Sequence, residues 1–526
     1  MGFTRPSYKH MKEKKLLLGT TEYRSLAALC FLLIIGMCVY LPFVSTTVLG
    51  ERDAYRVAVG LIESIRADQS QANALLYGLD KSFAYFTFLN FFSPLLKEKP
   101  DLVIPIMNYV NAIASIFMII PFYLLVRNHW GITTAILANL VLMSIPVWNQ
   151  TSLYGHPMVP AVASVILGLF LVDIRSKRGR TKSASLQLIF IDFLIVSTLS
   201  LGLMLRLDSL MIFLLIPGLL LLNNESYKNS FVRSCLYIAL PIFIFFAVKS
   251  IIPGLSALET NSSGGFLKEL LFWHNLSRFK DNLIFGSILF IKAFNPLFLL
   301  LFGLACFSLI KKRKYDSLCF ILPLFLFNYL FWIPNPSPAR HFIYAAPPFA
   351  IAIAIVLKYL YFSIKKKIAN KTYVQSTILF SVTLLLIVSN FKRYEPPFYE
   401  SNATANDLSF LGRHLERLEK QEAPIFVIGD VIPTLQYMQA SSDLVRVSSK
   451  QTDILNKFGK PIDLLIVNNG INTFVAFAFF HADNLVVDTT HFLEESDQYK
   501  NIGVFIDPTL EIEDFPGKTI NVKSSS

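Results

Sequence analysis

Long runs of apolar residues, separated by short polar or basic stretches, dominate about the first three quarters of this 526-residue chain. Most approach the roughly 20 residues that an α-helix needs to cross a hydrocarbon core about 30 Å thick. A soluble fold could not bury so many uniformly apolar helices. Eleven membrane spans are predicted: about Leu26–Leu49, Leu102–Val126, Ile132–Pro146, Met158–Asp173, Leu186–Leu205, Ser209–Leu222, Phe231–Pro253, Leu283–Ile310, Leu318–Ile333, Ile343–Leu360 and Val374–Val388.

Composition supports this interpretation, and charge orients the chain. Hydrophobic residues make up 54% of the sequence and charged residues 16%, whereas a soluble domain is about a quarter charged. Basic clusters precede the first span and follow the fourth, eighth and tenth, starting near Arg175, Lys311 and Lys365. All fall on one side, which predicts a cytoplasmic N-terminus. The net charge of +12 is then mostly membrane anchoring, and no nucleic acid is needed to explain it.

The segments between and after the spans predict two domains. Residues 1–391 form a transmembrane domain whose first outer loop is residues 50–101, and residues 392–526 form an extracytoplasmic domain. In that second part, helix-like stretches such as Asp407–Lys420 alternate with short apolar runs, which predicts a small α/β fold. We see no Gly-rich phosphate loop there. The predicted strands are Ile425–Ile428, Leu464–Val467, Leu485–Val487 and Val504–Ile506.

The first outer loop carries the strongest candidate chemistry. Glu51 and Asp53 stand one residue apart, immediately after the first span and before Ala54-Tyr55. Two such carboxylates could bind a metal ion or take a proton from an acceptor hydroxyl. The alternative is that they are ordinary charges at the N-terminus of the following helix. That helix is predicted to lie in the membrane interface, with an apolar face formed by Val57, Leu61, Ile62 and Ile65.

Three other outer turns carry polar residues. Arg206 and Asp208 lie in the turn between the fifth and sixth spans, where an ion pair within a helix hairpin is the simpler interpretation. Arg340 and His341 open the tenth span, where an arginine could bind a phosphate or simply reach the interface. The turn Thr151–Pro157 between the third and fourth spans contains Tyr154 and His156. A histidine there could be a metal ligand or an acid/base group, although most loop histidines are neither.

This arrangement resembles the GT-C superfamily of membrane glycosyltransferases, in particular the bacterial relatives of protein O-mannosyltransferases and aminoarabinose transferases. Those proteins begin with a cytoplasmic N-terminus and one helix, and then carry a long outer loop with an acidic motif at its start. Many end in an extracytoplasmic domain. The resemblance implies a multi-pass protein, in the plasma membrane if the source is bacterial. The motifs are short, and this chain has Glu51-Arg52-Asp53 where relatives have adjacent Asp-Glu.

The resemblance also implies a reaction and roles for residues. The donor would be a polyprenyl-phosphate-linked sugar, and the acceptor a protein, a lipid or a glycan. The enzyme would be an inverting hexosyltransferase, and a divalent cation on Glu51 and Asp53 is left open. Three sets of residues are implied: Asp53 and Glu51 as catalytic carboxylates; Arg340, Arg206 and His341 at the donor phosphate; and Tyr55, Tyr154 and His156 at the substrate.

Two other classes of membrane protein are alternatives. A transporter or flippase for a lipid-linked or small polar substrate would also have many spans and intramembrane charges. Against it, the two halves of the chain show no internal repeat. A polysaccharide polymerase or ligase would carry its largest outer loop late in the chain, whereas the longest loop between helices here is the first.

Overall fold

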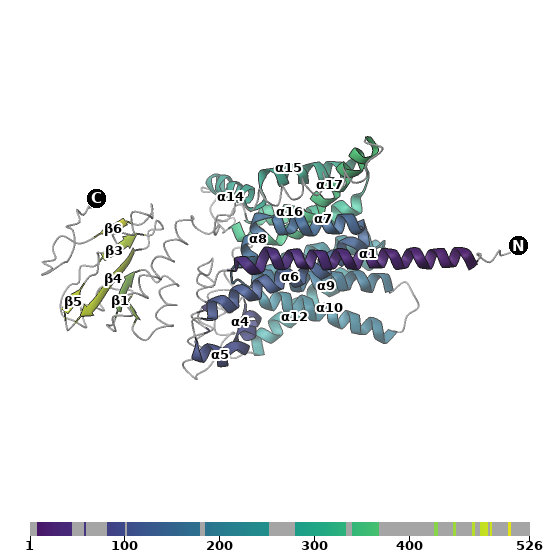
Figure 1. Ribbon diagram of the computed structural model, residues 1–526. Coiled ribbons are helices and arrows are strands. Elements are labelled where there is room, and N and C mark those ends of the chain that lie inside the picture. Colours follow the sequence, from purple (N-terminus) through teal and green to yellow (C-terminus); the bar gives the residue numbers. More distant parts are fainter. Residues whose placement is uncertain are drawn as a thin grey trace.

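The computed structural model describes a helical bundle and a separate sheet (Figure 1). The described residues are 8–44, 57–58, 61, 82–99, 102–178, 185–251, 279–332 and 339–367, together with six strands of the C-terminal part. The predicted span Val374–Val388 and the helix-like stretch Asp407–Lys420 lie outside them. The two-domain boundary near residue 391 therefore stays a prediction.

Six helical segments are long and apolar enough to cross a membrane. They correspond to the first, second, fourth, fifth, seventh and tenth predicted spans, which are confirmed at this level. Figure 1 shows them running side by side along one axis. They belong to α1 (Tyr8–Tyr40), α6 (Val103–Trp130), α9 (Met158–Arg178), α10 (Ser185–Leu205), α12 (Tyr227–Ile251) and α17 (Ala346–Lys367).

Two apolar segments are bent where a proline follows a non-helical residue: at Pro146, where the third predicted span ends, and at Pro296, within the eighth predicted span. The helices α7 (Ile132–Ser144) and α8 (Pro146–Leu153) meet at 67°, and α14 (Phe279–Phe294) and α15 (Pro296–Lys311) are bent by 86°. Proline lacks an N–H and disfavours helical geometry in the residue before it. The prediction of one continuous span over Leu283–Ile310 was therefore wrong in shape. Residues 151–153, predicted to lie in a turn, belong to α8.

The sixth and ninth predicted spans are shorter helices. The sixth begins as a 3-10 helix, η5 (Leu207–Leu214), and continues as α11 (Leu215–Leu222). The ninth is α16 (Tyr315–Trp332). With each bent pair counted once, the described residues give up to eight spans by length and composition.

The described part of residues 50–101, predicted as the first outer loop, contains short helices: α4 (Phe83–Leu89), η3 (Asn90–Phe92) and α5 (Ser93–Glu98). Within the predicted interfacial helix, residues 57, 58 and 61 are helical. Val57 and Leu61 are buried, as its apolar face predicts, and Ile62 and Ile65 lie outside the described residues.

Alternating helix direction brings distant segments to the same end of the bundle. Helices α9 and α10 pack closely through small residues, and Gly202 near the end of α10 lies against Ala161 and Val165 near the start of α9. A Cβ on Gly202 would lie 2.5 Å from Val165 Cγ2, and one on Gly168 would lie 2.7 Å from Leu199 Cδ2. Small residues allow such close approach between membrane helices. The starts of α6, α9 and α17 and the end of α10 thus share one end, which we call the site end.

The C-terminal part forms a six-stranded sheet of order β2-β1-β4-β3-β6, with β5 paired to β4. The pair β1–β2 is parallel and the other pairs are antiparallel. All four predicted strands are present, whereas β2 and β4 were not predicted. The strands are β1 (Ile425–Gly429), β2 (Val445–Ser448), β3 (Leu465–Asn468), β4 (Phe474–His481), β5 (Asn484–Val486) and β6 (Gly503–Phe505).

Candidate functional site

An ion pair forms where α10 ends. Arg206 leaves the helix with an extended backbone, φ −161° and ψ 119°, and starts η5. Its Nε donates to Asp208 Oδ2 at 3.1 Å, and both side chains are largely buried. Buried charges need partners of opposite charge, because burying an unpaired charge costs several kcal/mol of stability. The hairpin ion pair considered from the sequence is therefore present.

A second segment reaches the same carboxylate. The 3-10 helix η8 (Ala339–Ala345) opens α17 and carries Arg340 and His341, each 7% exposed. His341 Nδ1 lies 3.6 Å from Asp208 Oδ2. Asn328 of α16 donates to the His341 carbonyl at 3.2 Å, which fixes the backbone of η8 against α16.

Aromatic side chains that follow Arg340 and His341 in the sequence pack η8 and the start of α17 against α14 and α15. Phe342 meets Phe290 edge to face, with ring centroids 4.8 Å apart. Phe349 of α17 lies 4.5 Å from Phe294 and 5.0 Å from Phe302 between ring centroids. Aromatic pairs of this kind stabilise a fold by about 0.5–1.5 kcal/mol each beyond the effect of burial, so η8 and the start of α17 are held against α14 and α15 by close packing.

His156 lies in the turn between α8 and α9 and is 2% exposed. Two asparagines of α6 hold this turn. Asn111 Nδ2 donates to the carbonyls of residues 151, 154 and 156, at 2.7 Å for the last, and Asn108 Oδ1 accepts from the Gly155 N–H. The two asparagines stand three residues apart, on one face of the helix. The backbone around His156 is therefore fixed by α6.

We call Arg206, Asp208, Arg340, His341 and His156 the basic cluster. The charges of its two arginines and of His341 all act on His156. The pKa of His156 is well below its ordinary value, first because the ring is buried and then because these positive groups oppose another charge. Among the described residues, this cluster contains two guanidinium groups and one carboxylate, so it carries excess positive charge. Such a site suits an anion with several oxygens.

A buried polar helix adjoins the cluster. Helix α8 packs against η8, and its residues from Val147 to Leu153 are all buried. The helix includes Asn149, Gln150, Thr151 and Ser152, which is an unusually polar sequence for a buried element. The site end of the bundle is thus polar inside as well as charged.

The structure brings four predicted site residues together and leaves others untested. Arg206, Arg340, His341 and His156 lie in one cluster, and Tyr154 is half-buried in the turn that holds His156. Glu51, Asp53 and Tyr55 lie outside the described residues, so their roles stay predictions. Within the part of the chain that the structure describes, no group of three His, Cys, Asp or Glu side chains could hold a metal ion.

Sequence reasoning missed several supporting residues: Asn108, Asn111 and Asn328, and the position of Asp208 between two cluster members. One signal was available, because two asparagines three residues apart interrupt an apolar helix in Ile104–Ile113. Polar residues inside membrane helices usually have a specific partner.

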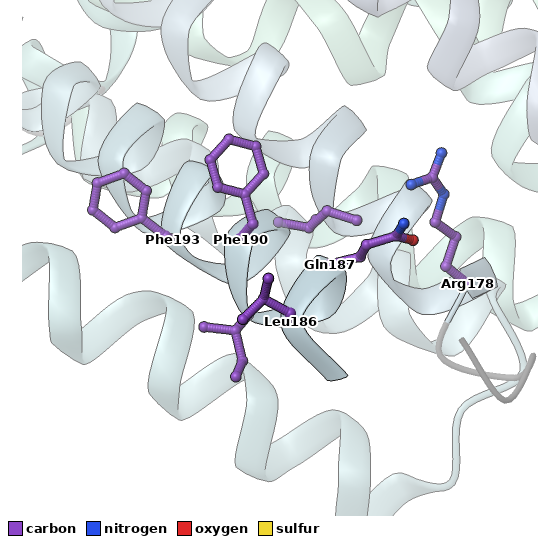
Figure 2. A pocket seen from close by; sticks show the side chains of 7 residues that line it. Arg178, Leu186, Gln187, Phe190 and Phe193 are labelled. Carbon is purple, nitrogen blue, oxygen red and sulfur yellow. The ribbon is translucent and has the colours of Figure 1, made fainter. Parts of the chain in front are cut away.

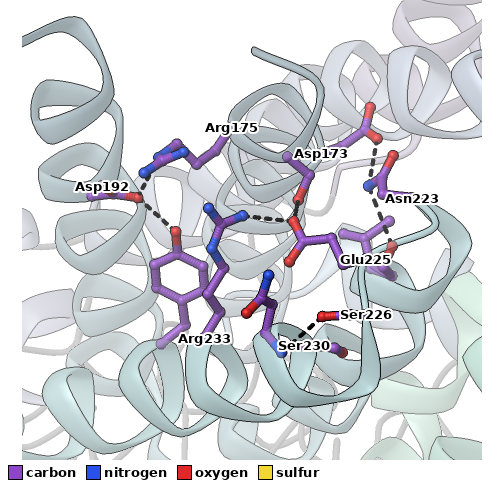
Figure 3. Close-up of polar contacts among 12 residues, drawn as sticks. Asp173, Arg175, Asp192, Asn223, Glu225, Ser226, Ser230 and Arg233 are labelled. Atoms are coloured by element: carbon purple, nitrogen blue, oxygen red, sulfur yellow. Dashed lines mark hydrogen bonds and ion pairs between the residues drawn. The ribbon is translucent and has the colours of Figure 1, made fainter. Parts of the chain in front are cut away.

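A second polar network lies at the opposite end of the bundle (Figure 3). Asp173 accepts from His129, Lys177 and Asn128 at 2.8 Å each and from Asn223 at 3.1 Å. Its carboxylate is fully hydrogen-bonded, which indicates a structural role. Neighbouring pairs tie the same helix ends together: Arg175–Asp192, Tyr237–Asp192, Ser176–Glu225 and Arg233–Glu225.

An open groove of about 590 Å³ lies along the start of α10 (Figure 2). Leu186, Phe190 and Phe193 line it and are strongly exposed, with Arg178 and Gln187 at one end. It lies at the other end of α10 from Arg206. Because of this position, the groove is separate from the basic cluster. Exposed apolar side chains on a spanning helix are expected to face lipid.

The sequence matches no protein-family model and no curated protein. The chain is similar to the solved structure of the archaeal oligosaccharyltransferase AglB from Archaeoglobus fulgidus, in complex with an inhibitory peptide and a dolichol-phosphate. The identity is 13% and the TM-score 0.46, over 70% of this chain and 55% of that chain. It therefore spans little more than half of that protein's length. ArnT from Cupriavidus metallidurans, bound to undecaprenyl phosphate, is 10% identical over 78% of this chain and 74% of that chain, with a TM-score of 0.40.

Proposed function

We propose that this protein is a membrane glycosyltransferase that moves a sugar from a polyprenyl-phosphate donor to an acceptor on the extracytoplasmic face. The buried basic cluster carries this proposal. The forked donors of Arg206 and Arg340 suit the oxygens of a phosphate. Such pairs are stronger in low-dielectric surroundings than in water. A phosphate carried on an apolar chain could reach this buried cluster from the bilayer.

The distribution of charge supports the proposed orientation. Basic residues gather at the end of the bundle opposite the site end, including Arg127, Arg178, Arg233 and Lys311. Positive loops stay in the cytoplasm. The basic cluster then lies near the extracytoplasmic face, and the N-terminus is cytoplasmic. Figure 1 draws the C-terminal sheet beyond the site end, which fits an extracytoplasmic domain.

The cluster would act on the leaving group. Arg340 and Arg206 hold the donor phosphate and stabilise the negative charge that develops when its bond to the sugar breaks. Asp208 holds the Arg206 guanidinium in place through Nε. His341 shares the same carboxylate and completes the phosphate site.

The acceptor side of the reaction is assigned to the first outer loop. Asp53, assisted by Glu51, takes the proton from the acceptor hydroxyl. That oxygen then bonds to the anomeric carbon as the bond to the phosphate oxygen breaks, which inverts the configuration. Tyr55 and Tyr154 contact the sugar. A divalent cation on Glu51 and Asp53 would further stabilise the departing phosphate. The acceptor is a protein, a lipid or a glycan.

A transfer assay tests this function. Purified protein in lipid nanodiscs is given candidate protein, lipid and glycan acceptors together with a panel of polyprenyl-phosphate sugars, and release of polyprenyl phosphate is measured for wild type, Asp53→Ala and Arg340→Ala. Lys314→Ala, which removes an exposed cation at the opposite end, is the control. We expect release by wild type and the control but not by the two site variants.

Two results would overturn the proposal. The first is that wild type consumes none of the donors, in which case uptake of a lipid-linked substrate would be assayed instead. The second is that both site variants match wild type. Elution volume and thermal midpoint establish that each variant is folded, and Arg340→Lys replaces Arg340→Ala if the alanine variant is not.

A further inference from the structure

The His156 ring is held in one tautomer by its neighbour in the chain. The backbone N–H of Met158, the first residue of α9, donates to His156 Nδ1 at 3.3 Å. A backbone N–H can only donate, so Nδ1 must carry the lone pair. In a neutral imidazole the other ring nitrogen then carries the proton. His156 therefore presents an N–H at Nε2.

The surroundings keep this ring uncharged. His156 is buried, and burial is the main reason why its pKa lies well below the ordinary value. The positive charges of Arg206, Arg340 and His341 lower the pKa further. A second proton on the ring would also displace the Met158 hydrogen bond. At neutral pH the ring is thus a hydrogen-bond donor without charge.

Hydrogen bonds to α6 and to the start of α9 fix the position of the His156 ring. Asn111 binds the His156 carbonyl and Asn108 binds the Gly155 N–H, so α6 fixes the backbone. Met158 at the start of α9 fixes the side chain. A preorganised donor loses little entropy when it binds a ligand. The His156 ring also lies close enough to Arg340, Arg206 and His341 for their charges to lower its pKa.

We infer that the Nε2–H of neutral His156 donates a hydrogen bond to an anionic oxygen of the phosphate bound in the basic cluster. This inference rests on the proposed function. It makes His156 neither a metal ligand nor a general base, because Nδ1 already accepts a hydrogen bond and Nε2 is protonated. An uncharged donor adds a hydrogen bond to the phosphate without adding a positive charge that would repel Arg206 and Arg340.

Two amide substitutions separate this role from a structural one. In His156→Asn the side-chain oxygen replaces Nδ1, so the variant keeps an acceptor for the Met158 N–H and loses the distal donor. In His156→Gln the amide nitrogen replaces Nε2, so the variant keeps the donor and loses the acceptor. A residue that only caps α9 would tolerate asparagine better, whereas a phosphate ligand would tolerate glutamine better.

Binding of a polyprenyl phosphate to each protein in nanodiscs is the measurement, with the matching polyprenol as the probe without phosphate. We expect His156→Gln to bind within about threefold of wild type and His156→Asn to bind about 10- to 100-fold more weakly, as loss of a hydrogen bond to a charged group implies. Affinity for polyprenol should be the same in all three proteins.

Any other pattern overturns the inference. Better binding by His156→Asn than by His156→Gln would show that the ring only caps α9. Equal binding by all three proteins would show that Nε2 makes no contact, and loss in both variants would show that a distal N–H is not sufficient. The proposed function fails separately, if wild type consumes no polyprenyl-phosphate sugar.

Discussion

Asp208 Oδ2 lies 3.1 Å from Arg206 Nε and 3.6 Å from His341 Nδ1. One buried oxygen atom thus links the break after α10 to the segment that opens α17. Asp208 is the carboxylate of the basic cluster, so its loss would leave buried positive groups facing one another. Removing one partner of a buried pair is strongly destabilising.

Asp208→Asn should therefore weaken both the fold and the phosphate site. We expect the free energy of unfolding to fall by about 3 kcal/mol, and binding of a polyprenyl phosphate to weaken because Arg206 loses its orientation. Thermal unfolding in detergent and lipid binding in nanodiscs measure the two effects.

The double variant Arg206→Gln/Asp208→Asn separates these effects. Removing both charges should restore part of the stability, because Arg206 is no longer a buried cation without its carboxylate, while phosphate binding stays weak. If the double variant bound the phosphate as wild type does, Arg206 would have no place in the site.

Stability at mild acid pH should depend on His156. Its pKa is lowered by folding, so below the ordinary value of 6.5 the unfolded chain binds a proton that the folded chain does not. Stability then falls with decreasing pH, by about 1.4 kcal/mol per pH unit in that window. His156→Gln should lose less stability than wild type between about pH 6.5 and 5. Equal pH slopes in thermal unfolding would contradict the assignment.

Close packing of α11 against α16 should be intolerant of a methyl group at Gly218. A Cβ there would lie 2.6 Å from Phe320 Cα and 2.8 Å from the Cys319 carbonyl oxygen, both backbone atoms. Gly218→Ala should cost about 1–3 kcal/mol, as overpacking usually does. Gly303→Ala is the matched control, since nothing lies within 4 Å of its Cβ. Equal thermal midpoints for the two variants would show that the helices separate easily.

Asp173 should matter for stability and not for donor binding. Asp173→Asn loses the charge that the largely buried His129 and two amides surround, at about 2–3 kcal/mol. Lys177 is 41% exposed and contributes little. The thermal midpoint should fall while affinity for a polyprenyl phosphate is unchanged. A variant that is stable but does not bind the lipid would place part of the site at this end.

The spanning helices could be predicted from sequence because each long apolar run satisfies the length of the bilayer by itself. The bends could not be predicted as reliably. At Pro296 the preceding Asn295 takes a positive φ of 67° and caps α15 with its side chain, a local choice that composition does not reveal. The central strand β4 was missed although it is the longest strand of the sheet.

Arg206, Arg340 and His156 could be singled out because each stands in a short polar turn between apolar runs. Their convergence could not, since it depends on how α9, α10 and α17 pack. The partner of Asn111 could not be predicted, because an amide within an apolar helix does not reveal which neighbouring segment it binds. The structure supplies the turn that it binds.

The most direct test of the account is the affinity of the protein in nanodiscs for a polyprenyl phosphate, relative to the same polyprenol, in wild type and Arg340→Ala. We expect wild type to prefer the phosphate and the folded variant to lose about 10- to 100-fold of that preference. Equal affinity of wild type for both lipids, or an unchanged preference in Arg340→Ala, would contradict a phosphate site in the basic cluster.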